Sequence, residues 1–299
     1  MLAAACADAL GVAYEPEQRG PADGRPRMLG GGYGPYAPGE YSDDTQMAVV
    51  VAEVAADGWD LRTEEALDRI AAGFVVDWFG GGATDVGTQT RSLLSRAAGT
   101  GGGAARLREI GAELHAVSGR TAGNGSLMRT APVALAFRGD ADAIVDAARA
   151  VSALTHHDPV AGDACALWCL AIDHAIGTGE LDVRVGLSRV DGGGYWAARI
   201  AEAEAEPPSA FASSSGWVVG ALQAAWSAIV RGDGLRGGIE AAVNGGGDTD
   251  TVAAIAGALL GAAYGASAVP AEWRSVVHGW PGLDASGLTT LALRCARRD

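Results

Sequence analysis

Apolar residues recur along this chain at the spacing of an α-helix, and convincing two-residue strand alternation is absent. After Thr63, a candidate N-cap, apolar side chains fall at Leu67, Ile70, Phe74 and Trp78, which places them on one helical face. Comparable apolar patterns cover residues 47–55, 160–176, 217–230 and 252–264. The periodicity therefore predicts an all-α fold.

The composition supplies enough apolar material for a large core. Hydrophobic residues make up 48% of the 299 residues and charged residues 19%, which argues against disorder. A single helical domain can reach this length. We therefore expect one compact domain spanning residues 1–299, and we expect the segment 202–215, which carries acidic, Pro and Ser residues, to be a surface loop.

The charge balance limits the partners of this chain. The formal net charge is −14, there is no long basic run, and the sequence contains no lysine. A nucleic-acid backbone is therefore excluded as an expected partner, as are Schiff-base chemistry and a Gly-Lys-Ser/Thr phosphate loop. An anionic ligand would have to be bound by metal ions or backbone N–H groups.

Cysteine usage and the amino-terminal sequence predict the compartment. Cys6, Cys165, Cys169 and Cys295 include no Cys-x-x-Cys pair and have no histidine at zinc-finger spacing, so we expect buried free thiols. The first residues lack the basic region of a secretory signal, and the apolar runs are too short or too interrupted to span a bilayer. We expect a cytoplasmic monomer with no membrane partner.

Two acidic clusters stand where a loop becomes a helix. Each cluster places two carboxylates beside a hydroxyl, next to glycine-rich backbone. The first is residues 41–47 (YSDDTQM) and the second is residues 245–251 (GGGDTDT). One such cluster would be ordinary helix capping. Two together indicate a site where Mg²⁺ or Mn²⁺ offsets the repulsion between carboxylates, because hard cations prefer carboxylate and hydroxyl oxygens.

Six motifs, in order along nearly the whole chain, resemble those of the ADP-ribosylglycohydrolase family, which contains ADP-ribosyl-arginine and ADP-ribosyl-serine hydrolases. They are residues 8–11 (DALG) with Glu15, residues 39–47 (GEYSDDTQM), residues 85–87 (DVG), residues 123–129 (GNGSLMR) with Pro132, residues 155–156 (TH), and residues 246–251 (GGDTDT) with Ala253, Ala254, Gly257 and Gly261. Any one motif is weak evidence, whereas six in order are strong. The resemblance implies one orthogonal multi-helix domain.

The resemblance also implies a role for each matching residue. A loop of backbone N–H groups would bind the diphosphate of ADP-ribose, and His156 would lie near the ribose. Glu15 and Asp85 would stand at the mouth of the site, with Asp43 and Asp250 as further catalytic carboxylates. The loop comprises Gly123, Asn124, Gly125 and Ser126, and the ligands of two divalent cations, Mg²⁺ or Mn²⁺, would be Ser42, Asp43, Asp44, Asp248, Asp250 and Thr251.

Two positions depart from the family pattern. Ser42 stands where the family usually has Thr, so an oxygen ligand is kept and only a methyl group is lost. Ala7 stands at a packing position where the opening motif usually has Gly. Neither change removes a group that the implied chemistry requires.

The implied function is metal-dependent hydrolysis of the N- or O-glycosidic bond between ADP-ribose and an acceptor. The acceptor would be a protein side chain, such as arginine or serine, or a small molecule. Three alternatives remain: a non-catalytic ADP-ribose binder or structural relative of the same fold, a metal-dependent hydrolase of another nucleoside derivative, and a metal-dependent phosphohydrolase. Trp217 and Trp226 fall in one apolar segment and are predicted to be core, with stacking on the adenine as the alternative for Trp217.

Overall fold

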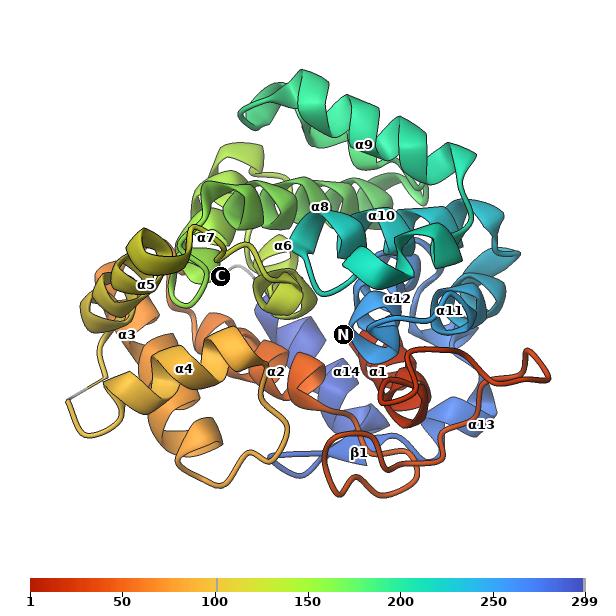
Figure 1. The fold of residues 1–299 in the computed structure, drawn as a ribbon, viewed down its shortest axis with the longest axis horizontal. Helices are drawn as coiled ribbons and strands as arrows, with labels where there is room; N and C mark the ends of the chain where they lie inside the picture. The colour runs from red at the N-terminus through yellow and green to blue at the C-terminus, as the bar shows by residue number, and fades with distance from the viewer. Residues whose placement is uncertain (101, 298–299) are drawn as a thin grey trace.

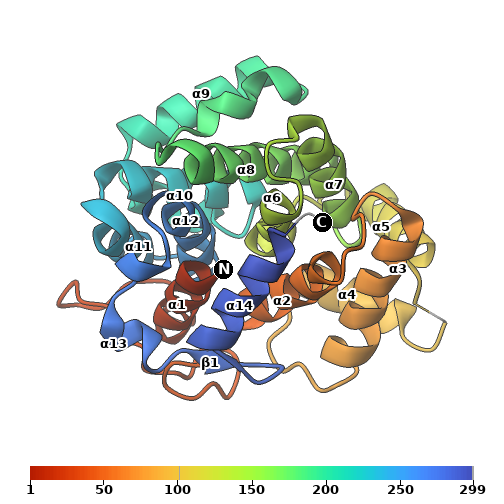
Figure 2. The same ribbon diagram turned by 180° about the vertical axis from the view of Figure 1, so that it is seen from behind.

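Helices make up most of the fold seen in a computed structural model, which describes residues 1–100 and 102–297 (Figures 1 and 2). The α-helices are α1 (Leu2–Gly11), α2 (Asp43–Ala56), α3 (Glu64–Ala72), α4 (Thr88–Ala97), α5 (Ala104–Ser118), α6 (Pro132–Ala136), α7 (Ala141–Ala153), α8 (Pro159–Thr178), α9 (Gly193–Ala205), α10 (Val218–Arg231), α11 (Gly234–Asn244), α12 (Thr249–Tyr264), α13 (Ala271–Arg274) and α14 (Ala285–Cys295). Shorter 3-10 or π segments are η1 (Val12–Tyr14), η2 (Gly73–Phe79), η3 (Asn124–Arg129), η4 (Val183–Arg189), η5 (Pro208–Ser214) and η6 (Ala266–Ala268).

The all-α prediction is confirmed. Within the described residues the only named strands are β1 (His278–Gly279) and β2 (Leu283–Asp284), an antiparallel pair in which Gly279 faces Leu283. The four further helical segments predicted from periodicity lie within α2, α8, α10 and α12, apart from Trp217 immediately before α10.

The helix predicted after Thr63 is also present. The Thr63 side chain accepts a hydrogen bond from the Ala66 N–H, as an N-cap should. The helix continues as the π segment η2, so Phe74 and Trp78 stay on the buried face. The Trp78 indole donates to Gln46 Oε1 over 2.7 Å, which ties this segment to α2.

Most of residues 202–215 lie at the surface, as predicted, but the segment is mainly helical and is not a loop. α9 continues to Ala205, and residues 208–214 form η5. η5 packs against α10, and Phe211 is buried in the core. The acidic, Pro and Ser composition of this segment concealed its buried apolar residues, Ala203 and Phe211, whose contacts with the core order the segment.

Helices α1 and α12 pack against each other at very short range. A Cβ on Gly257 would come within 2.7 Å of the Ala3 carbonyl oxygen, and one on Gly11 within 2.4 Å of Asp250 Cα. Small residues on both helices allow this approach. The pairing brings the carboxyl-terminal turn of α1 to the first turn of α12, where the acidic residues lie.

Gly11→Ala is therefore expected to destabilise the protein by about 1–3 kcal/mol, because the added methyl group would collide with backbone atoms of α12. Gly177→Ala in α8 is the matched control. A Cβ there meets nothing within 4 Å, so that variant should gain up to about 1 kcal/mol from helix propensity. Urea denaturation of both variants measures the difference. A Gly11→Ala protein as stable as wild type would contradict the close packing.

Helix α8 runs through the interior. Within the described residues it is the one helix that is long and apolar enough to cross a membrane by length and composition, and 72% of the relevant window is buried inside the protein. The core helix of a globular protein meets the same criteria, so this finding is weak evidence for a membrane span.

Candidate functional site

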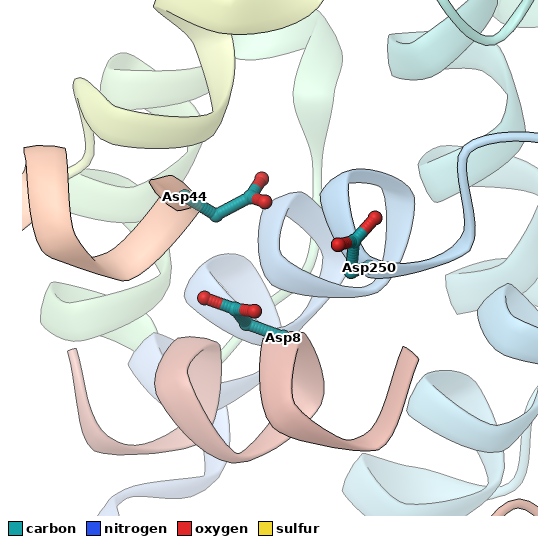
Figure 3. A group of neighbouring side chains, drawn as sticks. All are labelled: Asp8, Asp44 and Asp250. Atoms are coloured by element: carbon teal, nitrogen blue, oxygen red, sulfur yellow. The ribbon is translucent and has the colours of Figure 1, made fainter. Parts of the chain in front are cut away.

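Three carboxylates from three different helices meet at the centre of the molecule. Asp8 comes from the last turns of α1, Asp44 from the start of α2 and Asp250 from the first turn of α12 (Figure 3). All three are buried, and one carboxylate oxygen from each lies within 4.8 Å of one oxygen from each of the others. The sequence predicted Asp44 and Asp250 as ligands, whereas it gave Asp8 no role.

A second group shares one member with the first. Glu15, Asp248 and Asp250 also place carboxylate oxygens within 4.8 Å of one another. Asp250 therefore stands between two clusters, which is the arrangement expected of a residue that contacts two cations. Glu15, predicted as a catalytic carboxylate at the mouth of the site, lies close enough to be a ligand itself.

Asp8 connects α1 to the beginning of α2. Its Oδ1 accepts from the Ser42 backbone N–H at 2.9 Å and from the Ser42 hydroxyl at 2.7 Å. Its Oδ2 accepts from the Thr45 N–H at 3.0 Å and the Thr45 hydroxyl at 2.6 Å. Asp8 thus accepts from two backbone N–H groups at the start of α2, those of Ser42 and Thr45, and so acts as a cap supplied by a neighbouring helix.

Helix capping, the alternative explanation of the acidic clusters, does not describe Asp248. Asp248 occupies the N-cap position of α12, yet its side chain makes no capping hydrogen bond. In contrast, Asp140, Asp158 and Asp284 each accept from a backbone N–H two or three residues ahead, as capping aspartates do.

The oxygen atoms of this site fit hard divalent cations. Asp44 Oδ1 and Asp248 Oδ1 are buried and have no hydrogen-bond partner among the described residues. The Ser42 hydroxyl lies 2.7 Å from Asp8 Oδ1 and 3.0 Å from Asp44 Oδ2, and its single proton cannot serve both. Unpartnered carboxylate oxygens inside a protein are costly unless a positive charge neutralises them, and Mg²⁺ and Mn²⁺ bind such oxygens.

Burial and mutual repulsion raise the pKa values of the clustered acids. Burial raises the pKa of Asp8 to about 6, against its four hydrogen bonds, and burial followed by the charge of Asp248 raises the pKa of Glu15 to about 9. The pKa values of Asp44 and Asp250 rise well above the ordinary range, first through burial and then through neighbouring carboxylates. These carboxylates cannot all be charged together without a compensating cation.

The remaining predicted carboxylates lie around the two clusters. Asp43 belongs to neither group, although burial and then the charge of Asp85 raise its pKa well above the usual value. Asp85 is half-buried, and burial and then Asp248 raise its pKa. Thr251 is buried, and its backbone N–H donates to Asp250 Oδ1 at 3.0 Å.

A cavity of about 660 Å³ opens beside Asp248. This volume is in the range of small-molecule sites. Four of the residues predicted to bind the substrate line it, namely Gly123, Asn124, Gly125 and His156, and so does the cluster member Asp248. Other lining residues include Gln89, Thr90, Arg120, Asp158 and Trp217. Ser126 does not line the cavity, and its hydroxyl accepts from Ser152 Oγ at 2.9 Å in the interior.

The glycine-rich loop is tied both to α10 and to the acidic cluster. The Asn124 N–H donates to the Gly216 carbonyl at 3.2 Å. The Asn124 side-chain amide donates to the Ser215 carbonyl at 2.9 Å and to Asp248 Oδ2 at 2.7 Å. A ligand bound along this loop would therefore lie next to the carboxylates.

The prediction that Trp217 belongs to the core is wrong. Trp217 immediately precedes α10 as its N-cap, lines the cavity and is 42% exposed, so the alternative of stacking on a ligand is open to it. Trp226, inside the helix, is buried as predicted. The periodicity located the helix correctly but could not show that its first residue lies outside the packed turns.

The sequence reasoning also missed Asp8 as a cluster member. The available signal was a lone acidic residue within the apolar run of residues 2–12, where only a partnered or metal-bound carboxylate is tolerated. Asp8 had been identified only as part of a motif.

Known proteins share the whole of this architecture. A family model described as ADP-ribosylglycohydrolase matches residues 1–299. An ADP-ribosyl-[dinitrogen reductase] glycohydrolase of Rhodospirillum rubrum is 28% identical over 250 residues, which are 83% of this chain and 77% of the relative. An ADP-ribosylarginine hydrolase Tri1 of Pseudomonas putida (strain GB-1) is 30% identical over 294 residues, covering 91% of this chain and 71% of the relative. A solved structure described as an ADP-ribosylglycohydrolase-related protein complex has a TM-score of 0.77 and 30% identity, covering 99% of this chain and 95% of the other. The chain belongs to the ADP-ribosylglycohydrolase family.

Proposed function

We propose that this protein is a metal-dependent hydrolase that cleaves the N-glycosidic bond between ADP-ribose and an arginine side chain. The observation that carries the proposal is a pair of carboxylate groups that share Asp250, one of which includes Asp248, a residue that lines the same cavity as the glycine-rich loop. Carboxylate clusters beside a ligand-sized cavity are typical of metal-assisted hydrolysis.

Two divalent cations are proposed as cofactors, Mg²⁺ or Mn²⁺. Asp8, Asp44 and Asp250 would hold one, and Glu15, Asp248 and Asp250 the other. The hydroxyls of Ser42 and Thr251 and the carboxylate of Asp43 would complete the predicted ligand set. When bound, the cations would neutralise the carboxylates and polarise ribose hydroxyls and a water molecule.

Binding of the diphosphate is assigned to the backbone of the loop at residues 123–125. The protein has a net charge of −14 and no lysine, and backbone N–H groups can bind phosphate oxygens without a basic side chain. Trp217, partly exposed at the cavity wall, is available to stack on the adenine. Binding energy from this half of the ligand would act at a distance from the reacting bond.

Proton transfer is assigned to two half-buried acids close to Asp248, Glu15 and Asp85. In the hydrolysis a water oxygen forms a bond to the anomeric carbon of the distal ribose as the bond to the guanidine nitrogen breaks. One carboxylate accepts a proton from the water, and the departing nitrogen receives a proton.

Two observations favour arginine as the acceptor. The relative from Pseudomonas putida is an ADP-ribosylarginine hydrolase. In addition, the acids around the cluster would attract a guanidinium group, which is a permanent cation.

The test is an assay with Mg²⁺ or Mn²⁺ on peptides that carry ADP-ribose on either arginine or serine. Release of free ADP-ribose from the arginine-linked peptide, with little from the serine-linked peptide, is expected. Release of AMP instead would indicate a phosphohydrolase. Equal inactivity on both peptides, with ADP-ribose still bound, would favour the non-catalytic alternative and contradict the proposal.

A further inference from the structure

A buried arginine lies directly behind the cavity. Arg129 is fully buried and, among the described residues, forms no ion pair with a carboxylate. Its guanidinium instead donates to the Gly125 carbonyl at 3.3 Å and to the Thr155 hydroxyl at 2.7 Å, and it stacks over the Phe74 ring at 4.7 Å. A buried cation without a carboxylate is costly, so its contacts with Gly125, which lines the cavity, and with Thr155, which precedes His156, call for a functional explanation.

The Thr155 hydroxyl has only one arrangement that uses its proton. Thr155 is buried, and its Oγ1 has two hydrogen-bond partners: the Arg129 guanidinium and His156 Nδ1 at 2.8 Å. Because an arginine can only donate, Thr155 must accept from it, and the hydroxyl proton is left for His156 Nδ1. The reverse arrangement would leave a buried hydroxyl proton unsatisfied, which is unfavourable.

His156 then carries its own proton on the other ring nitrogen. Burial, and then the positive charge of Arg129, hold the pKa of His156 well below its usual value, so the ring is neutral. Its Nε2 edge lies against the glycine-rich loop: a Cβ on Gly123 would come 3.2 Å from Nε2, and one on Gly125 would come 3.3 Å from it. His156 lines the cavity together with both glycines.

We propose that Arg129 and Thr155 are positioning residues that hold His156 as its Nε2–H tautomer, so that the imidazole presents a hydrogen-bond donor to an oxygen of the bound nucleotide sugar. The identity of that ligand rests on the proposed function, whereas the tautomer does not. The same guanidinium fixes the Gly125 carbonyl, so one buried group sets both the ring and the loop beside it.

A neighbouring amide braces the same wall. The Gln89 side-chain NH₂ donates to the Thr121 carbonyl at 3.2 Å and to the Thr155 carbonyl at 2.9 Å. The backbone that carries Thr155 and His156 is therefore held in place independently of the Thr155 hydroxyl. Removing that hydroxyl should change the protonation of the ring while leaving its position largely intact.

The test is ¹⁵N NMR of protein labelled at histidine, because a protonated and an unprotonated ring nitrogen give clearly different shifts. The chain has five histidines, and His156→Gln identifies the signals of His156. The wild type should show His156 protonated at Nε2 and unprotonated at Nδ1. Thr155→Val should reduce that population, and Thr155→Ser should restore it. Thr289→Val, which removes a hydroxyl bonded within α14, is the matched control and should leave the signals unchanged.

Affinity gives a second measurement. Titration calorimetry with ADP-ribose should show roughly tenfold weaker binding for Thr155→Val, the loss expected when one hydrogen bond of about 1.4 kcal/mol is impaired. Thr155→Ser should bind nearly as tightly as wild type. Circular dichroism confirms that each variant is folded.

Two outcomes would overturn the inference. One is a wild-type His156 protonated at Nδ1, a result that needs no variant to fold. The other is a folded Thr155→Val protein with an unchanged tautomer. Failure of the wild type to bind ADP-ribose would contradict the proposed function instead, and the NMR result on the free protein would still decide the role of Arg129 and Thr155.

Discussion

Asp250→Asn is expected to lower the turnover number by at least about 100-fold at saturating Mg²⁺ or Mn²⁺, corresponding to roughly 3 kcal/mol of lost charge stabilisation. Asp250 is the one carboxylate shared by the two groups that meet in the structure. The first group also contains Asp8 and Asp44, and the second also contains Glu15 and Asp248. Asparagine has nearly the same size but carries no negative charge, so the variant would weaken both proposed cation sites. Steady-state kinetics on an arginine-linked ADP-ribosyl peptide measure the effect.

The fold should survive this change. The amide oxygen of asparagine can still accept from the Thr251 N–H, which Asp250 Oδ1 does in the native protein. Asp140→Asn is the matched control, because Asp140 caps α7 away from the acidic clusters and Asn caps about as well as Asp. Near-wild-type turnover in Asp250→Asn would show that Asp250 has only a structural role, and equal losses in both variants would point to general destabilisation.

Removal of divalent metal is expected to abolish turnover and to lower the melting temperature. Asp44 and Asp248 each have a buried oxygen without a partner among the described residues, and the surrounding carboxylates repel one another. A cation that binds only the folded state at about 100 times its Kd contributes roughly 2.7 kcal/mol. At about 2 °C per kcal/mol for a chain of this size, the shift is about 5 °C.

The experiment compares thermal unfolding after exhaustive chelation with unfolding after Mg²⁺ or Mn²⁺ is returned. Asp250→Asn should lose most of the metal-dependent increase, while its metal-free form should be at least as stable as the metal-free wild type because one repulsive charge is gone. Asp140→Asn should respond to metal as wild type does. Full turnover in excess chelator, with no change in melting temperature, would contradict the metal requirement.

Local sequence determined the helices and part of the site. The apolar spacing after Thr63 requires one buried helical face, and the structure has that face from Leu67 to Trp78. The cluster members Asp44, Asp248 and Asp250 were found because paired acids beside glycine-rich loops are a local pattern. Periodicity, capping and short motifs depend on residues within a few turns of each other, so they can be read without knowing the fold.

Tertiary structure alone decided which groups meet. In the sequence, Asp8 is a single acidic residue in an alanine-rich helix. It lies beside Asp44 and Asp250 only because the glycines between α1 and α12 let those helices approach closely. The hydroxyl of Thr155 could be assigned as a donor only once Arg129 was placed behind it, 26 positions away in the chain. Side chains distant in sequence are brought together by packing, and neither burial nor the direction of a hydrogen bond is specified until that packing is formed.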